Sequence, residues 1–197
     1  DDQAMEDFLL REALGDAVLT LADGAQLAGE ELWEVFDTAR NAKHFLEPLA
    51  RKVGDMLVVE QTAIAGALRP EILADEEYGQ QTADYVATRL NFLADSLERG
   101  WAGQTSKDGG LVFSRTLRGV TQTYEIDGAL IRSSEARRLN QDKMVAALHE
   151  TYERYPTLNT KDKETRMTGP VSLVNELMEF GRKGITVQRY KGLGEMN

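Results

Sequence analysis

Apolar residues recur at three- and four-residue spacing over most of the chain, which is the pattern of amphipathic helices. The pattern predicts helices over six segments: residues 1–14, 30–53, 55–67, 80–99, 134–154 and 172–183. Pro48 is expected to bend or end the second helix locally, because proline lacks the N–H that a helix interior needs. Gly184 follows the last helix and is expected to terminate it.

Alternation of apolar and polar positions, the period of a strand, is clearest between residues 111 and 126. Two such runs flank an Arg118-Gly119 turn and predict a β-hairpin. A shorter hairpin is predicted within residues 18–27, around an Asp23-Gly24 turn. The polar stretch over residues 155–170 is expected to be an exposed loop.

The chain ends with GITVQRYKGLGEMN, which combines a strand signal with a glycine-bearing turn. Ile185, Val187 and Tyr190 predict a strand. Residues 191–195 then predict a tight loop, since glycine adopts positive φ easily. A helix that leads into a strand is half of an α/β unit, so we expect the other strands elsewhere and the chain to be an excised piece.

Acidic and basic residues are distributed unevenly. The net charge is −10; residues 1–100 hold 21 acids and 8 Lys/Arg, whereas residues 101–197 hold 12 and 15. Any phosphate-binding surface is therefore expected in the second half.

There is no cysteine, which excludes disulfides and thiolate sites and fits a reducing cytoplasm. No apolar stretch approaches the roughly 18 residues of a membrane span, so we expect a cytoplasmic protein without a membrane partner.

The segment QRYKGLGEMN, residues 188–197, closely resembles a signature of the DNA gyrase B subunits and their relatives among the type IIA topoisomerases. In that family it lies near the end of the metal-binding Toprim domain. The opening DDQAMEDFLL resembles a segment of the same domain that follows its earlier strands. The long stretch between the two is similar to an insertion found in B subunits of the Gram-negative type.

The resemblance implies an α+β fold: a mainly helical insert with a β-hairpin, attached to a partial α/β Toprim element made of the C-terminal helix and strand. Residues 1–15 would be a flanking Toprim segment, residues 16–168 the insert, and residues 169–197 the C-terminal Toprim helix, strand and loop. Within the insert, residues 16–100 are acidic and mainly helical. Residues 101–168 carry the hairpin, a helix and the polar loop.

The resemblance also implies a role in an ATP-dependent enzyme that negatively supercoils DNA by double-strand passage. Its partners would be DNA, the gyrase A subunit and the other domains of the B subunit. The family cleaves DNA with a tyrosine from its other subunit, together with Mg²⁺ held by an EGDSA-like segment and an Asp-x-Asp motif. Neither motif occurs in this sequence, and the ATP-binding domain is also missing. We expect the chain alone to be inert and without cofactor, with Mg²⁺ and ATP acting in the intact parent.

Two groups of cations are the candidate DNA-binding residues. Arg189 and Lys191 lie beside the loop that Gly192 and Gly194 are expected to form, where loop amides could add donors to a phosphate. The second group belongs mostly to the helix over residues 134–154 and consists of Arg132, Arg137, Arg138 and Lys143.

Plainer interpretations exist for both groups. Lys191 could be merely solvated, and the arginines could pair with neighbouring acids such as Glu135 and Asp142. His44 and His149 lie on separate predicted helices, so we expect no zinc site. Lys161-Asp162-Lys163-Glu164 is expected to be a solvated charge run. No catalytic or metal-binding residue is predicted.

Two further hypotheses stay open. The acidic, helical first half favours a structural or protein-interaction module of the same parent that does not contact DNA. The third hypothesis is an independent small protein that shares only the terminal motif, which would require a natural stop after Asn197.

Overall fold

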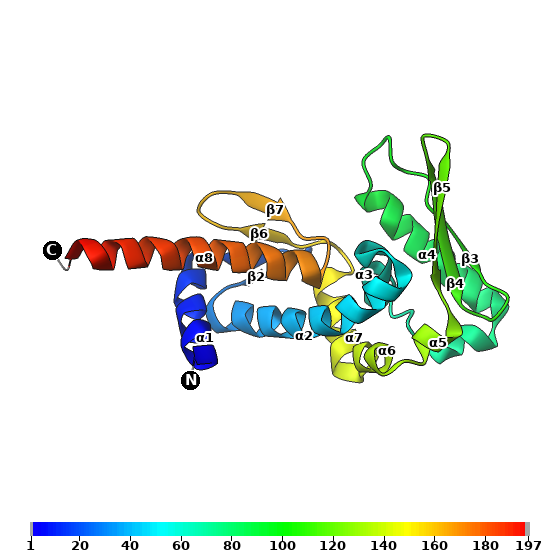
Figure 1. Ribbon diagram of the computed structural model, residues 1–197, viewed down its shortest axis with the longest axis horizontal. Coiled ribbons are helices and arrows are strands. Elements are labelled where there is room, and N and C mark those ends of the chain that lie inside the picture. Colours follow the sequence, from blue (N-terminus) through cyan, green and yellow to red (C-terminus); the bar gives the residue numbers. More distant parts are fainter. Residues whose placement is uncertain (1, 196–197) are drawn as a thin grey trace. The chain divides into compact units, whose positions relative to one another are not determined.

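The computed structural model describes residues 2–195, with side chains up to residue 192. Its helices and two small antiparallel sheets make an α+β fold (Figure 1). One compact unit contains the two ends of the chain, up to Arg40 and from Arg154 onward, and the other contains Asn41–Glu153. The boundaries predicted after residues 15 and 168 separate the insert from the flanking Toprim segments. They rest on the resemblance to the family and stay predictions.

The first unit contains the predicted N-terminal helix and hairpin. Its four short strands pair in the order β2-β1-β6-β7, all antiparallel. The helix α2 (Gly29–Val53) supplies residues 29–40, and Pro48 lies inside the part of α2 that belongs to the second unit. The remaining elements are α1 (Asp2–Ala13), the 3-10 turn η1 (Leu14–Asp16), β1 (Val18–Thr20), β2 (Gln26–Leu27), β6 (Thr157–Asn159), β7 (Glu164–Arg166) and α8 (Pro170–Glu195).

Residues 155–170, predicted to be an exposed loop, contain the hairpin β6–β7 instead. Leu158 is buried and pairs with Leu19 of β1, so the strand is fixed by a partner far away in the sequence. One buried leucine among threonines gives almost no alternation. The local sequence pattern therefore does not predict this hairpin.

The predicted C-terminal strand over residues 185–190 and the predicted loop over residues 191–195 are not formed, because α8 continues through both (Figure 1). Gly192 and Gly194 accordingly lie in the helix and form no loop. A helix pairs its own backbone N–H and C=O groups, whereas a strand needs a neighbouring strand to pair them.

Gly184, predicted to end this helix, does not have a positive φ. A Cβ on Gly184 would lie 3.0 Å from the Cβ of Ala13, and a Cβ on Gly181 would overlap the Cδ1 atom of Leu10. Both glycines therefore permit the close packing of α8 on α1. The sequence alone does not reveal that α1 packs against these two glycines, so it does not distinguish a helix end from a packing contact.

The second unit combines helices with a three-stranded sheet of order β3-β4-β5. The predicted hairpin is confirmed with both strands as expected: Leu117 pairs with Val120, and Arg118 and Gly119 take φ values of 52° and 80°. Helix α4 packs against β3. The elements are α3 (Met56–Ile64), the 3-10 turn η2 (Pro70–Ala74), α4 (Glu76–Leu93), β3 (Ala102–Thr105), β4 (Leu111–Leu117), β5 (Val120–Ile126), α5 (Gly128–Ile131), α6 (Ser134–Leu139) and α7 (Asp142–Tyr152).

The helix predicted over residues 134–154 is divided into α6 and α7. Ser133 caps α6 by accepting a hydrogen bond from the Ala136 N–H at 3.2 Å. The N–H of Asn140 donates to the carbonyls of Ala136 and Arg137, which closes α6, and α7 starts anew after Gln141. Among the helices that the described residues form, none has both the length and the apolar character needed to cross a bilayer.

Candidate nucleic-acid interface

The predicted group of four cations lies on consecutive elements of the second unit. Arg132 follows α5, Arg137 and Arg138 lie on α6, and Lys143 lies in the first turn of α7. All four side chains are exposed. Because α6 packs on both α5 and α7, the four belong to one part of the unit, and we call them the α5–α7 basic cluster.

Within residues 2–192, no member of this cluster forms a salt bridge. Glu135 instead accepts a hydrogen bond from the Ser134 hydroxyl at 3.1 Å. The pKa of the Glu135 carboxyl is lowered by its own backbone N–H first, then by Ser134 and by the charge of Lys52. The alternative prediction, that the arginines pair with Glu135 and Asp142, is therefore wrong. The cluster keeps its donors available for an external anion.

Two members of the cluster rest against the protein. The guanidinium carbon of Arg138 lies 6.0 Å from the centroid of the Phe45 ring. Arg132 lies against α5, since its Nη1 atom is 3.0 Å from the position of a Cβ on Gly128. The described residues give Arg137 and Lys143 no such contact, so these two cations can be changed with the least structural effect.

A groove of about 670 Å³ lies beside α6 and α7 in the same unit. Arg137 lines it together with Arg69, a cation that the sequence does not single out. The Nη2 atom of Arg69 is 3.2 Å from the position of a Cβ on Gly66. No local motif marks Arg69, because only the fold brings the segment after α3 to the groove that Arg137 of α6 also lines. Acids also line the groove, namely Glu71 and Asp142, so its charge is mixed.

The other predicted pair, Arg189 and Lys191, is exposed near the end of α8 and belongs to the first unit. The backbone N–H groups around Lys191 are helical, and interior helical N–H groups bond to carbonyls four residues earlier. The structure thus offers two exposed cations here but no cradle of loop amides.

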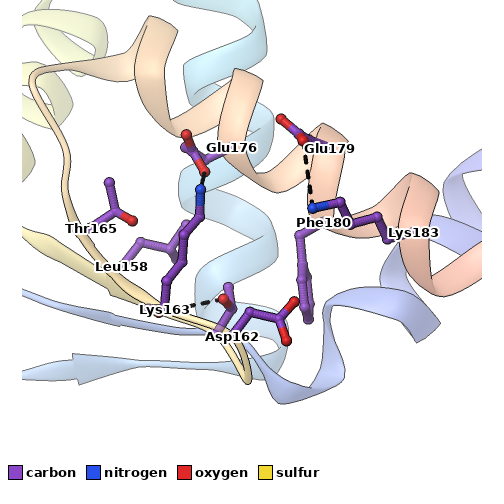
Figure 2. Close-up of a pocket in the computed structure, with 9 residues that line it drawn as sticks. Leu158, Asp162, Lys163, Thr165, Glu176, Glu179, Phe180 and Lys183 are labelled. Atoms are coloured by element: carbon purple, nitrogen blue, oxygen red, sulfur yellow. Dashed lines mark hydrogen bonds and ion pairs between the residues drawn. The ribbon is translucent and has the colours of Figure 1, made fainter.

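A small pocket of about 100 Å³ lies between the turn of the β6–β7 hairpin and α8 (Figure 2). The Nζ of Lys163 lies 3.0 Å from an Oε of Glu176, and the Nζ of Lys183 lies 3.6 Å from an Oε of Glu179. The hydrogen bond to Glu176 and its charge raise the pKa of Lys163. Ligand pockets usually have a volume of at least about 300 Å³, so this one is too small for an ordinary ligand. The ion pair between Lys163 and Glu176 instead joins the hairpin to α8.

The charge run at residues 161–164 makes ion pairs with residues elsewhere in the first unit. Besides the pair of Lys163 with Glu176, the Nζ of Lys161 lies 3.2 Å from a carboxylate oxygen of Asp16. Among the described residues, no group of three or more His, Cys, Asp or Glu side chains is placed to hold a metal ion.

Comparison with known proteins gives a consistent result over the full length of the chain. No family model matches the sequence. The chain is 37% identical over 197 residues to the DNA gyrase B subunit from two strains of Caulobacter vibrioides, and 28% identical over 197 residues to the DNA gyrase B subunit of Rickettsia bellii. These alignments cover 100% of the chain but only 23% of the Caulobacter proteins and 24% of the Rickettsia protein. The chain is therefore similar along its whole length to DNA gyrase B subunits, and it spans about a quarter of the length of these curated relatives.

Proposed function

We propose that this chain is part of the B subunit of a DNA gyrase, an ATP-dependent type IIA topoisomerase that negatively supercoils DNA by double-strand passage. The observation that carries this proposal is the 37% identity from end to end with a gyrase B subunit. The parent would act on DNA in the cytoplasm together with the gyrase A subunit, using Mg²⁺ and ATP bound outside this chain. The chain alone would be inert.

In this proposal residues 16–168 are an insert within the Toprim domain, and residues 1–15 and 169–197 flank it. The packing of α1 on α8 supports this, because it brings the two flanking segments together at Leu10 with Gly181 and at Ala13 with Gly184. An insert of this kind leaves the domain and returns to it at neighbouring points.

The insert would contribute to DNA binding through the α5–α7 basic cluster. Its cations are exposed and form no salt bridge within the described residues. Exposed cations without an internal ion pair gain the most free energy on binding phosphate oxygens, because no salt bridge within the protein has to be broken first. Arg189 and Lys191 are a second proposed phosphate contact, now on a helix rather than a loop.

Replacement of Arg137 and Lys143 by alanine in the intact parent enzyme tests the DNA role. Supercoiling should require more enzyme, and the affinity for DNA should fall at every salt concentration, with the larger loss at low salt. The matched control is Arg99→Ala with Lys107→Ala, which removes two exposed cations outside the cluster. Equal activity of the two double variants would show that the α5–α7 basic cluster is not part of the DNA-binding surface.

A second candidate function is a protein-interaction module of the same parent without DNA contact. Helix α4 favours it, because Tyr78, Tyr85 and Phe92 follow at seven-residue intervals and are 43%, 43% and 53% exposed. Side chains at this spacing share one helix face. Tyr78→Ser with Phe92→Ser should then weaken assembly of the parent complex and leave its affinity for DNA unchanged.

A further inference from the structure

Strand β5 has one unpaired edge. It is the last strand of the sheet β3-β4-β5, and within the described residues no other strand pairs with it (Figure 1). The strand is paired with β4 along all its residues, from Val120 opposite Leu117 to Ile126 opposite Leu111. Its second side therefore presents a regular row of backbone donors and acceptors.

The hairpin geometry identifies which residues point to that free edge. Leu117 and Val120 close a two-residue turn and exchange hydrogen bonds, and paired residues then alternate between bonded and non-bonded along the strands. Thr121, Thr123 and Glu125 fall at the non-bonded positions. Their N–H and C=O groups point away from β4, and their side chains are exposed.

This edge lacks the usual protection against pairing. Native edge strands are commonly blunted by proline, by lysine or by a bulge. The sequence from Val120 to Ile126, VTQTYEI, has no proline and no lysine, and the pairing with β4 runs without a bulge. Glu125 is the one charge within it, and Val120 is 63% exposed.

The charges at the two ends of the strand are opposite. The turn that precedes β5 carries Arg118, which is exposed, while the end of the strand carries Glu125 and is followed by Asp127. An antiparallel neighbour of the same sequence would place each cationic end beside an anionic end. This charge complementarity favours a second copy over a parallel or an unrelated strand.

We propose that β5 pairs antiparallel with β5 of a second copy of this chain, about a two-fold axis at Thr123. Thr123 faces Thr123 of the partner subunit, and Thr121 faces Glu125 of the partner subunit, which gives roughly six backbone hydrogen bonds. The β5 edges of both copies are used up, so this contact joins two chains into a six-stranded sheet with β3 at each outer edge. This inference does not depend on the proposed role in DNA binding.

Sedimentation equilibrium of the full chain tests the dimer. The average mass should rise from one chain toward two as the concentration increases. Thr123→Pro removes an N–H that points away from β4, so the hairpin keeps its hydrogen bonds while the dimer no longer forms. Thr123→Ala keeps the N–H and should dimerise like the unchanged chain. A chain that stays monomeric at every concentration, or a Thr123→Pro variant that dimerises normally, would overturn the proposal.

A charge exchange provides a test that does not depend on proline. Arg118→Glu should weaken dimerisation, because it places like charges beside each other at both ends of the paired strands. Adding Glu125→Arg to this variant should restore most of the dimer. Failure of Arg118→Glu to weaken the dimer, or of the second change to restore it, would contradict the antiparallel register.

Discussion

Arg89 of α4 donates from Nη2 to the main-chain carbonyl of Tyr152, the last residue of α7, at 2.9 Å. Its Nη1 donates to the carbonyl of Glu153 at 2.7 Å, and its Nε donates to Oε1 of Gln61 at 3.0 Å. The side chain is buried. Carbonyls at the end of a helix lack intrahelical donors and carry its negative pole, so one guanidinium joins α3, α4 and α7 and also caps α7.

Replacement of Arg89 by methionine should destabilise the second unit strongly. The change removes the donor to two carbonyls and to the Gln61 side chain in the interior, where each unpaired group costs about 1–3 kcal/mol. Allowing for relaxation, we expect the free energy of unfolding in urea to fall by about 3 kcal/mol. Thr88→Ala, on the exposed side of the same helix, should change it by less than about 0.5 kcal/mol. A decrease below about 1 kcal/mol for Arg89→Met would mean that these bonds are not maintained in solution.

Gly103→Ala should also destabilise the protein, for a steric reason. A Cβ at this position in β3 would lie 2.5 Å from the main-chain oxygen of Ala83 in α4, which is backbone and cannot rotate away. Overpacking of this kind costs about 1–3 kcal/mol, measurable as a lower midpoint of thermal unfolding. Gly15→Ala is the control, since nothing lies within 4 Å of its Cβ position. Equal midpoints for the two variants would refute the close contact of β3 with α4.

Tyr152→Phe should stabilise the protein. The Tyr152 hydroxyl is buried, and within the described residues it has no hydrogen-bond partner. An unpaired buried hydroxyl costs about 1 kcal/mol or more, so the variant should gain about that much at pH 7 in urea unfolding. A decrease in stability instead would show that the hydroxyl has a partner in solution, such as a bound water.

The same residue predicts a dependence on alkaline pH. Burial, followed by the charge of Glu60, raises the pKa of Tyr152 above its ordinary value. Because the folded-state pKa is the higher one, the contribution of the neutral phenol is complete below the unfolded pKa of about 10 and is lost as the pH rises above it. The advantage of Tyr152→Phe should therefore grow between pH 9 and pH 11, on the order of 1 kcal/mol per pH unit once the pH exceeds about 10. An advantage that stays constant over this range would contradict the shift.

The local sequence pattern predicts the elements that depend only on neighbouring residues. The hairpin over residues 111–126 combines alternation with a turn whose residues take positive φ, and the structure has both strands at the predicted bounds. The length of the C-terminal helix does not follow from local pattern, because a glycine such as Gly184 can either end a helix or let another helix pack closely, and only the contact with α1 decides between them. Likewise, the sequence marks Arg137 within a basic run, whereas Arg69 reaches the same groove only through the fold.

Binding of a labelled DNA duplex to the isolated chain, measured by fluorescence anisotropy over a range of salt concentrations, tests most directly whether the α5–α7 basic cluster contacts DNA. The affinity should fall linearly on logarithmic axes, and Arg137→Ala with Lys143→Ala should make the slope shallower by about 1.8, or about 0.9 for each phosphate that is no longer neutralised. The control Arg99→Ala with Lys107→Ala should keep the original slope. Absence of binding at low salt, or an unchanged slope in the Arg137 and Lys143 variant, would contradict the DNA-binding role.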